Sequence, residues 1–327
     1  MLAVSDDRSP SLSASLPIAR SGRPIATVLE PHAILGMLAM DYAIVVAIEF
    51  VYAIATLALI SLGLAIVFGM MRIINLAHGE FMVMGSYSAT VAVHHGVEIW
   101  ISILLIPPIV VGVIGLIIER LIIRHLYGRM VETMLATWGL SLFIVGVLTM
   151  IFGDHTEGVP TPLRGIRIGD YQVSGYSLFV IVLSIVVLLG VYILLRSTRL
   201  GLLARATMQN SDMAAALGTN TPKVYSMTFA FGAALAGLAG GALAPVSGVF
   251  PSIGGSYIGK AFITVIGGGA APLFGTASAS TLFGIINQIA TFATNPVYGE
   301  VALLLAAIVL IRAMPQGITG RFFRGRL

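Results

Sequence analysis

The sequence has no cysteine, very little charge and almost no lysine. The absence of cysteine among 327 residues excludes disulfides, thiol catalysis and cysteine-ligated metals. Charged residues make up only 10%, whereas a soluble domain carries about 25% because its surface faces water. The only lysines are Lys223 and Lys260, and neither lies in a G-x-x-x-x-G-K-[ST] loop. The chain is therefore not expected to bind ATP in the P-loop manner, nor to present a water-facing surface over most of its area.

Motifs for catalysis are also missing. The sequence contains no H-E-x-x-H, no G-x-S-x-G and no cluster of metal-ligating histidines. We therefore predict no catalytic residues, no metal site and no cofactor bound by this chain, which is not expected to be an enzyme. The net charge of +4 comes from basic residues scattered between apolar runs, so these residues indicate membrane topology rather than nucleic-acid binding.

Long apolar runs are what the sequence has in abundance. Hydrophobic residues make up 57%, and several runs reach the roughly 20 residues that cross a bilayer. This pattern predicts an all-α integral membrane protein, a polytopic helical bundle of about 8–9 transmembrane segments. The nine apolar segments are 44–71, 80–93, 99–123, 132–152, 176–195, 226–246, 257–268, 277–292 and 297–311. The second and seventh are short and interrupted by glycine, so either is expected to be broken or re-entrant.

The predicted transmembrane domain covers residues 41–320 and is flanked by two polar ends. Residues 1–40 are rich in Ser, Pro and Arg and are expected to be a flexible tail, or an over-extended start before Met40. Residues 321–327 form a basic tail. Arginine and lysine in short loops mark the cytoplasmic side. If nine spans are counted, three basic groups fall on that side: Arg120, Arg124 and Arg129; Arg196, Arg199, Arg205 and Lys223; and Arg312, Arg321, Arg324 and Arg326. The C-terminus is then cytoplasmic and the N-terminus periplasmic, although Arg20 and Arg23 conflict mildly with that placement.

The segment RIINLAHGEF places four polar side chains between two apolar runs. They are Arg72, Asn75, His78 and Glu80. A charge at the bilayer centre costs roughly 2.5–3.5 kcal/mol, so these groups must lie at an interface, in a protein-lined cavity or in mutual pairs. Two interpretations stay open: a tight cytoplasmic loop whose polar groups cap two helices, or a gate beside the transport pathway.

The longest hydrophilic insertion on the inferred cytoplasmic side spans about 197–224. Asn210 or Ser211 can cap a helix, Asp212 suits its first turn, and Gly218 suits the position after its end. The pattern predicts a short helix outside the membrane. Such a helix has few contacts of its own, so a partner protein is expected to bind it; an ordinary solvated connector is the alternative.

Glycine marks two further segments. Gly267, Gly268 and Gly269 precede a proline and must break a helix, which predicts either a cytoplasmic hairpin or a broken backbone beside the pathway. Gly237 and Gly241 have the GxxxG spacing that allows close helix packing.

Four segments together resemble a known family. They are GLAIVFGMMRIINLAHGEFMVMGSYSA, RATMQNSDMAAALG, FITVIGGGAAPLFGT and RAMPQGI. The chain is similar over residues 44–320 to the permeases of branched-chain amino acid importers, which belong to the ABC transporters. It looks most like the first permease of the pair.

The resemblance implies a multi-pass protein of the bacterial inner membrane and a set of partners. These are a second permease, which could be a different chain or a second copy, two cytosolic ATPase subunits that bind ATP and Mg²⁺, and a periplasmic substrate-binding protein. It also implies that the segment 205–218 is the coupling helix, with the ATPase-coupling residues Arg205, Gln209, Asn210, Asp212, Ala215 and Gly218.

Two alternatives remain at this point. ETMLATWGLSLFIV at 132–145 and GIINQ from Gly284 look like the branch of the family that handles urea and short amides. A stand-alone secondary transporter is the alternative from another class. It would carry paired ionisable groups at mid-membrane, whereas Glu49 and Glu300 are expected near the outer interface.

Overall fold

The computed structural model describes residues 31–269 and 271–322, and within them the fold is a bundle of long apolar helices. Six helices of this described part are long and apolar enough to cross a membrane, or up to seven if one bent pair of helices counts as a span. The predicted all-α polytopic membrane fold is confirmed. The predictions for residues 1–30 and 323–327 lie outside the described residues.

Helices account for nearly all of the regular structure. Their bounds are α1 Pro31–Met71, α2 His78–His94, α3 Ile99–Leu104, α4 Ile106–Leu121, η2 Ile123–Leu126, α5 Met130–Phe152, α6 Gly175–Ser197, α7 Arg199–Gln209, α8 Ser211–Ala216, α9 Thr221–Ser247, η3 Pro251–Ile253, α10 Gly254–Gly268, α11 Pro272–Ala293, α12 Pro296–Ala313 and α13 Gly317–Phe322. Each of the nine predicted apolar segments is helical. The third is divided into α3 and α4 at Leu105, just before the prolines of the segment IPP.

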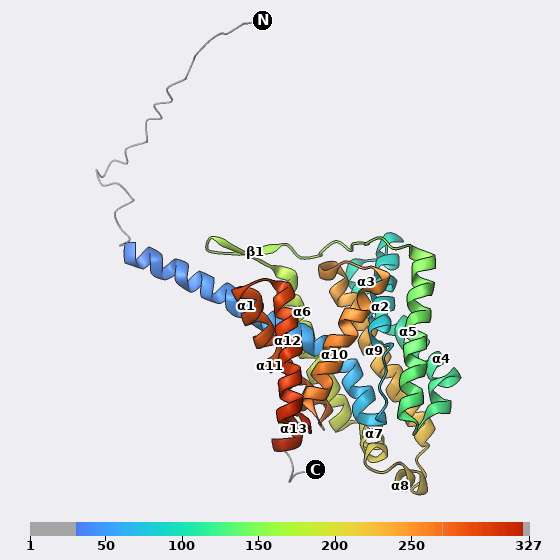
Figure 1. The fold of residues 1–327 in the computed structure, drawn as a ribbon. Helices are drawn as coiled ribbons and strands as arrows, with labels where there is room; N and C mark the ends of the chain where they lie inside the picture. The colour runs from blue at the N-terminus through green and yellow to red at the C-terminus, as the bar shows by residue number, and fades with distance from the viewer. Residues whose placement is uncertain (1–30, 270, 323–327) are drawn as a thin grey trace, which may run out of the picture.

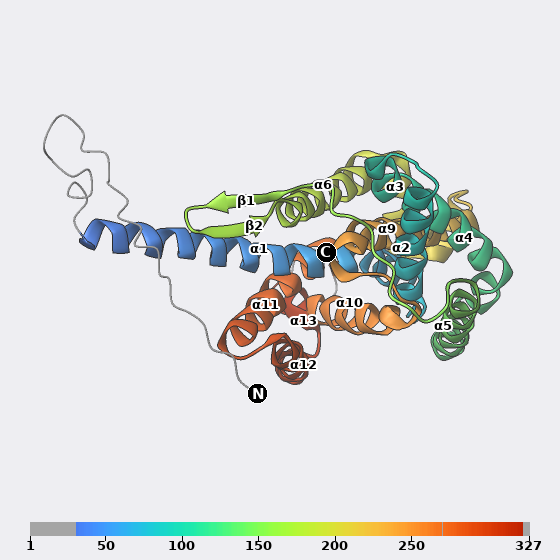
Figure 2. The ribbon, with the colours of Figure 1, turned by 90° about the horizontal axis from the view of Figure 1, so that it is seen from above.

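Two features differ from the sequence predictions. The first helix begins at Pro31, so residues 31–40, which were assigned to the flexible tail, are helical. The connection after α5 contains an antiparallel hairpin of β1, Gly165–Ile168, and β2, Tyr171–Ser174. This hairpin lies beside α1 where α1 extends past the bundle, and Tyr42 packs on Tyr171 with ring centroids 5.7 Å apart (Figure 2).

The bundle has two distinct ends. One, here called the hairpin end, carries β1 and β2; the other, the α8 end, carries α7, α8 and α13 (Figure 1). The α8 end also contains the C-terminal ends of α4 and α6 and the N-terminal end of α9. Those basic residues of the three predicted groups that the structure describes therefore lie at one end of the molecule. The topology predicted from nine spans placed all three groups on one side.

Two short helices begin inside the bundle rather than at an end. After α1, the irregular residues 72–77 run back into the bundle, and α2 begins only at His78 (Figure 1). Its counterpart α10 follows residues 248–250 and the short helix η3, and α10 and α11 meet at a bend of 113°. The predicted broken character of the second and seventh segments thus corresponds to two helices that each cover part of a span.

Two sets of helices repeat one packing arrangement and form the two halves of the bundle: α1, α2 and α4 in the first half, and α9, α10 and α11 in the second. The equivalent helices α1 and α9 run in opposite directions (Figure 1). The helix α4 packs on α9 as α11 packs on α1, and α2 packs on α9 as α10 packs on α1. The equivalent helices touch each other through glycines. A Cβ atom on Gly63 of α1 would overlap the backbone of Gly232 of α9, and one on Gly79 of α2 would overlap the backbone of Gly254 of α10. The small residues therefore bring these backbones into direct contact, as in other membrane helix pairs.

The centre of the bundle is formed by α9, the most deeply buried of the long helices. Its Gly237 lies against the backbone of Pro107, and its Gly241 lies against the Pro107 ring and the carbonyl of Ile103. Both glycines of the GxxxG pair thus lie where α9 meets α3 and α4, and this contact accommodates no larger side chain.

Candidate functional site

The hydrophilic insertion at the α8 end folds into two short helices, α7 and α8. Each is capped at its start by its own sequence: the Thr198 hydroxyl accepts a hydrogen bond from the Gly201 N–H, and Asn210 Oδ1 accepts one from the Met213 N–H. At its close, Gly218 has a φ of 88°, a left-handed conformation that glycine adopts without strain. The amino acids of this loop therefore set both ends of α8.

The exposed face of α8 is apolar. Met213 of α8 is 58% exposed, and Leu217, the residue directly after α8, is 80% exposed. The Leu217 N–H bonds to the Met213 carbonyl, so the helical spacing continues and the two side chains are neighbours on one face. Ala215 is also exposed, while Ala214 is buried against the protein. The bundle thus projects a small apolar surface from its α8 end, beside the exposed Asp212 at the start of the helix (Figure 1).

The predicted coupling residues do not all lie on this surface. Asn210 and Gly218 shape the ends of α8, and Gln209 is exposed at the end of α7. Arg205 lies elsewhere, because its guanidinium donates a hydrogen bond to the Leu195 carbonyl near the end of α6. In the structure Arg205 therefore holds α7 against α6, and it does not lie beside Met213 and Leu217.

The segment 72–80 is inside the protein, not in an exposed loop. Asn75, His78 and Glu80 are almost completely buried, and only Arg72 is exposed. Asn75 Oδ1 accepts from the Ala77 N–H, and His78 Nε2 donates to the Ile60 carbonyl at 3.0 Å. Since Ile60 is about 16 Å of helix from the end of α1, at 1.5 Å per residue, His78 lies well within the bundle.

Glu80 lies where the starts of α2 and α10 meet. It is in the first turn of α2, and its Oε1 lies beside Gly254, the first residue of α10. Both helices direct the positive ends of their dipoles toward this carboxylate, which lowers the cost of burying it. The segment 72–80 thus lies within the protein: the Asn75 side chain closes the turn that leads into α2, and Glu80 lies in the first turn of α2, whose N-cap residue Ala77 makes no side-chain cap bond.

The three consecutive glycines lie against the C-terminal segment. The Gly268 carbonyl accepts a hydrogen bond of 2.6 Å from the Thr319 hydroxyl, and a Cβ on Gly269 would meet Gln316 and Gly317. Gly267 packs on Phe283 of α11. These glycines therefore allow α10, α11 and α13 to approach one another closely at the α8 end.

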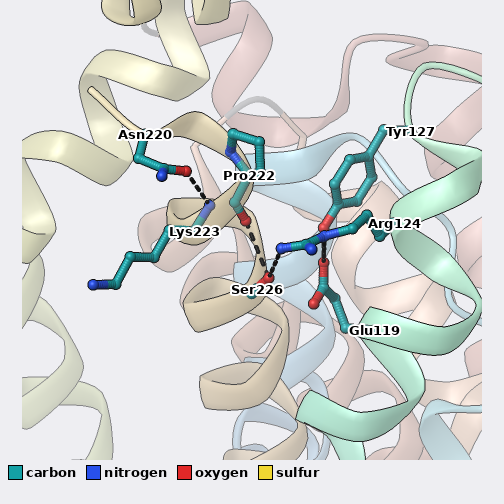
Figure 3. Close-up of polar contacts among 7 residues, drawn as sticks. All are labelled: Glu119, Arg124, Tyr127, Asn220, Pro222, Lys223 and Ser226. Atoms are coloured by element: carbon teal, nitrogen blue, oxygen red, sulfur yellow. Dashed lines mark hydrogen bonds and ion pairs between the residues drawn. The ribbon is translucent and has the colours of Figure 1, made fainter. Parts of the chain in front are cut away.

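A polar cluster near α8, built on the buried Glu119 and the exposed Arg124, was not predicted from the sequence. Glu119 of α4 is fully buried, and its Oε1 accepts a hydrogen bond from the Tyr127 hydroxyl and lies 3.9 Å from Nε of Arg124 (Figure 3). Arg124 also donates to the hydroxyl of Ser226, one turn into α9, at 3.5 Å. Burial, together with the Glu119 carboxylate, raises the pKa of Tyr127 well above its usual range, so its hydroxyl stays a donor.

This cluster connects α4 to the part of α9 that directly follows α8. Asn220 Oδ1 caps the start of α9 by accepting from the Lys223 N–H, and Ser226 donates to the Pro222 carbonyl (Figure 3). Charged and hydrogen-bonded side chains therefore join the end of α4 to the first turns of α9, a few residues after α8. The sequence carried one signal for this cluster, an acidic residue, Glu119, at the end of an apolar run.

The geometry therefore describes a membrane bundle with an exposed apolar helix and a polar connection behind it. Within residues 31–269 and 271–322, no group of three His, Asp or Glu side chains is placed to hold a metal ion. An exposed apolar helix at one end of such a bundle suits the class of membrane subunits that bind a partner protein.

The comparisons with known proteins agree with this class. Residues 46–314 match the family described as branched-chain amino acid transport system, permease component. The high-affinity branched-chain amino acid transport system permease protein LivH of Escherichia coli K12 is 28% identical over 283 residues, which cover 82% of this chain and 92% of LivH. The corresponding BraD protein of Pseudomonas aeruginosa is 28% identical over 284 residues, with the same shares. The probable LivH permease of Methanocaldococcus jannaschii is 29% identical over 283 residues, covering 81% of this chain and 88% of the relative. No solved structure matches the chain.

The chain belongs to the branched-chain amino acid transport permease family. It is a multi-pass inner-membrane permease subunit of an ABC importer, a non-catalytic component that works with partner subunits. The resemblance stated from its four sequence segments is thereby confirmed.

Proposed function

We propose that this permease carries branched-chain or other hydrophobic amino acids across the inner membrane, together with a second permease subunit. Two cytosolic ATPases bind ATP and Mg²⁺ and supply the work, and a periplasmic binding protein delivers the substrate. This chain itself binds no nucleotide or other cofactor. The family match and the names of the relatives favour amino acids over urea and short amides, and a permease of this family has no need of the ion coupling that a secondary transporter uses.

The observation that carries this proposal is the exposed apolar face of α8. Two apolar side chains, Met213 and Leu217, are held in water by a well-capped helix that buries only Ala214. A protein gains little by ordering such a helix alone, whereas a partner that buries both side chains gains about 1.5–3 kcal/mol from each. We assign the partner as an ATPase subunit, and the α8 end as the cytoplasmic end, where the basic residues gather. The C-terminus is then cytoplasmic and the hairpin end periplasmic.

The coupling mechanism follows from the path between α8 and the bundle. Closure of the ATPases would displace α8, and α9 begins only a few residues later. The Glu119 cluster would carry this displacement into α4, and the glycine contacts of α9 would carry it into α1. Substrate would then cross between the two permeases as their halves tilt.

The test is a charge placed on the exposed face of α8. In the purified complex, Leu217→Asp is expected to reduce ATPase co-purification and substrate-stimulated ATP hydrolysis by about tenfold or more, because a charge replaces about 1.5–3 kcal/mol of buried apolar contact. The control is Leu217→Met, which keeps an apolar side chain of similar size and is expected to behave as wild type.

Two further measurements make the outcome decisive. The thermal stability of the isolated permease should be the same for both variants, because Leu217 is 80% exposed. If Leu217→Asp retained full ATPase association and hydrolysis, α8 would not be the docking element. Uptake of radiolabelled leucine by proteoliposomes containing all subunits tests the substrate, and uptake of urea instead would refute the amino-acid assignment.

A further inference from the structure

A partly open cavity of about 390 Å³, with a mainly apolar wall that also carries polar side chains, lies in the bundle away from α8. It is bounded by α1, α9, α10, α11 and α12, and its volume falls in the range of about 300–1,000 Å³ typical of small-molecule sites. Ser247, the last residue of α9, lines it, which places it toward the hairpin end of the molecule. The cavity therefore lies on the side opposite the proposed ATPase contact.

Three helices contribute polar side chains to this cavity at helical spacing. On α1 these are Glu49, Tyr52 and Thr56, which are three and four residues apart. On α10, Tyr257 and Lys260 are three apart. Side chains at these spacings lie on one face of a helix, so each helix directs a polar stripe at the same space. Since polar groups are costly within a membrane, such a convergence indicates a functional site.

The third helix, α11, adds uncharged polar groups. Asn287, Gln288 and Thr291 line the cavity and again share one helix face. The rest of the wall is apolar and includes Leu57, Ile60 and Leu303. The cavity thus offers both polar and apolar surface, as a ligand with a polar end and an apolar end requires.

The cavity contains charges of both signs, and these charges are only partly paired with other residues. Lys260 Nζ donates to Glu300 Oε1 at 2.5 Å, which occupies one of its three N–H groups. Among the described residues, Glu49 has no basic group within 4.0 Å. The Thr56 hydroxyl is buried beside Tyr52 in the same space. An anion, a cation with free donors and a buried hydroxyl therefore line one space.

We propose that this cavity is a transient binding site for the transported substrate, a zwitterionic α-amino acid with an apolar side chain. Glu49 receives its ammonium group, Lys260 and the Thr56 hydroxyl receive its carboxylate, and the apolar wall accommodates its side chain. This inference rests on the proposed transport function and extends it: the permease itself distinguishes zwitterions from neutral and singly charged solutes. Urea would leave both charges unpaired, and a monocarboxylate would place its own charge near Glu49.

The experiment uses the absence of cysteine from this chain. Gln288→Cys introduces one thiol into the cavity, and its rate of labelling by a membrane-impermeant maleimide is measured on this chain in the permease pair in nanodiscs, without binding protein or ATP. Leucine, isocaproate and urea are added in turn at equal concentrations. Leucine at about ten times its Kd should slow labelling about tenfold, because it leaves about a tenth of the sites free, while isocaproate and urea should not slow it.

Two variants test the assignment of the charges. Glu49→Gln in the Gln288→Cys background should abolish protection by leucine, whereas Asp154→Asn, which changes an exposed acid near the hairpin end, should leave it intact. Labelling that is equal with and without leucine would overturn the proposal, as would protection that survives Glu49→Gln. Protection by urea would reassign the site to neutral amides.

This outcome is separable from that of the proposed function. Labelling requires neither ATP nor the ATPases, whereas uptake requires all subunits. If wild-type proteoliposomes accumulate leucine but the cavity shows no protection, only the binding site is wrong. If leucine protects the cavity but the proteoliposomes do not accumulate leucine, the binding site is supported and the ATP-driven function is refuted.

Discussion

The helices α2 and α10 begin at the same place in the bundle but differ in what surrounds them. Both start inside the protein, α2 after irregular chain and α10 after the short helix η3, and their first turns touch through Gly79 and Gly254. Around α2 the polar groups are buried, and His78 is bonded to the Ile60 carbonyl. Around α10 they face a cavity, which Tyr257 and Lys260 line. In this repeated arrangement the start of α2 is thus closely packed, whereas its equivalent α10 borders a cavity that can hold a ligand.

The largest effect is expected where the two helices touch. A valine at position 79 would overlap the Gly254 carbonyl, and backbone cannot move aside as a side chain can. Overpacking typically costs about 1–3 kcal/mol and more in such a case, so Gly79→Val should yield little folded protein on size-exclusion chromatography in detergent. The control is Gly255→Val, one residue beyond the contact, where a Cβ meets nothing within 4 Å. Equal yields of the two variants would contradict the described contact.

A smaller effect is expected from the polar groups. His78→Ala removes the partner of the Ile60 carbonyl in a fully packed region and should cost about 2–4 kcal/mol, from the lost hydrogen bond and the cavity left behind. On the α10 side, Tyr257→Phe removes a hydroxyl that donates to Ser247 beside the cavity, where water can replace it, and should cost less than about 1 kcal/mol. Melting temperatures in detergent measure both. If Tyr257→Phe were the more damaging change, the contrast between the two helices would be wrong.

The smallest effect concerns a single hydrogen bond between helices. The Ser86 hydroxyl of α2 donates to the Gly240 carbonyl of α9 at 2.8 Å, and Ser86→Ala should lower stability by about 0.5–1.5 kcal/mol. Near the start of α10, by contrast, Ser256 is exposed and donates only within its own turn. Ser256→Ala should therefore leave the melting temperature unchanged, and a loss equal to that of Ser86→Ala would show that α10 is also fully packed there.

The helices were predictable because hydrophobicity is a local property of the sequence. Each predicted apolar segment is helical in the structure. The ends of α8 were also predicted correctly, from the capping residue Asn210 at its start and Gly218 after its end. The hairpin of β1 and β2 was not predicted, because its strands are only four residues long and lie in a polar loop. The helical character of residues 31–40 was missed because this stretch is less apolar than the rest of α1.

The polar sites were harder to predict because their members are far apart in the sequence. The cavity joins Glu49 to Lys260, and the cluster near α8 joins Glu119 to Ser226. No spacing rule connects such residues before the helices are packed. The segment 72–80 was recognised as unusual from its polar residues alone, but its burial depends on α2 beginning inside the bundle, which hydropathy does not reveal.

The paired glycine contacts have a mechanical consequence. Where Gly63 meets Gly232 and Gly79 meets Gly254, backbone lies directly against backbone, with the Val67 side chain beside Gly232 and the Glu80 side chain beside Gly254. Sliding along the helix axes would drive neighbouring residues, which do carry a Cβ, into the opposing backbone. These contacts therefore set the spacing between the paired helices, and a larger side chain at any of the four glycines would widen it.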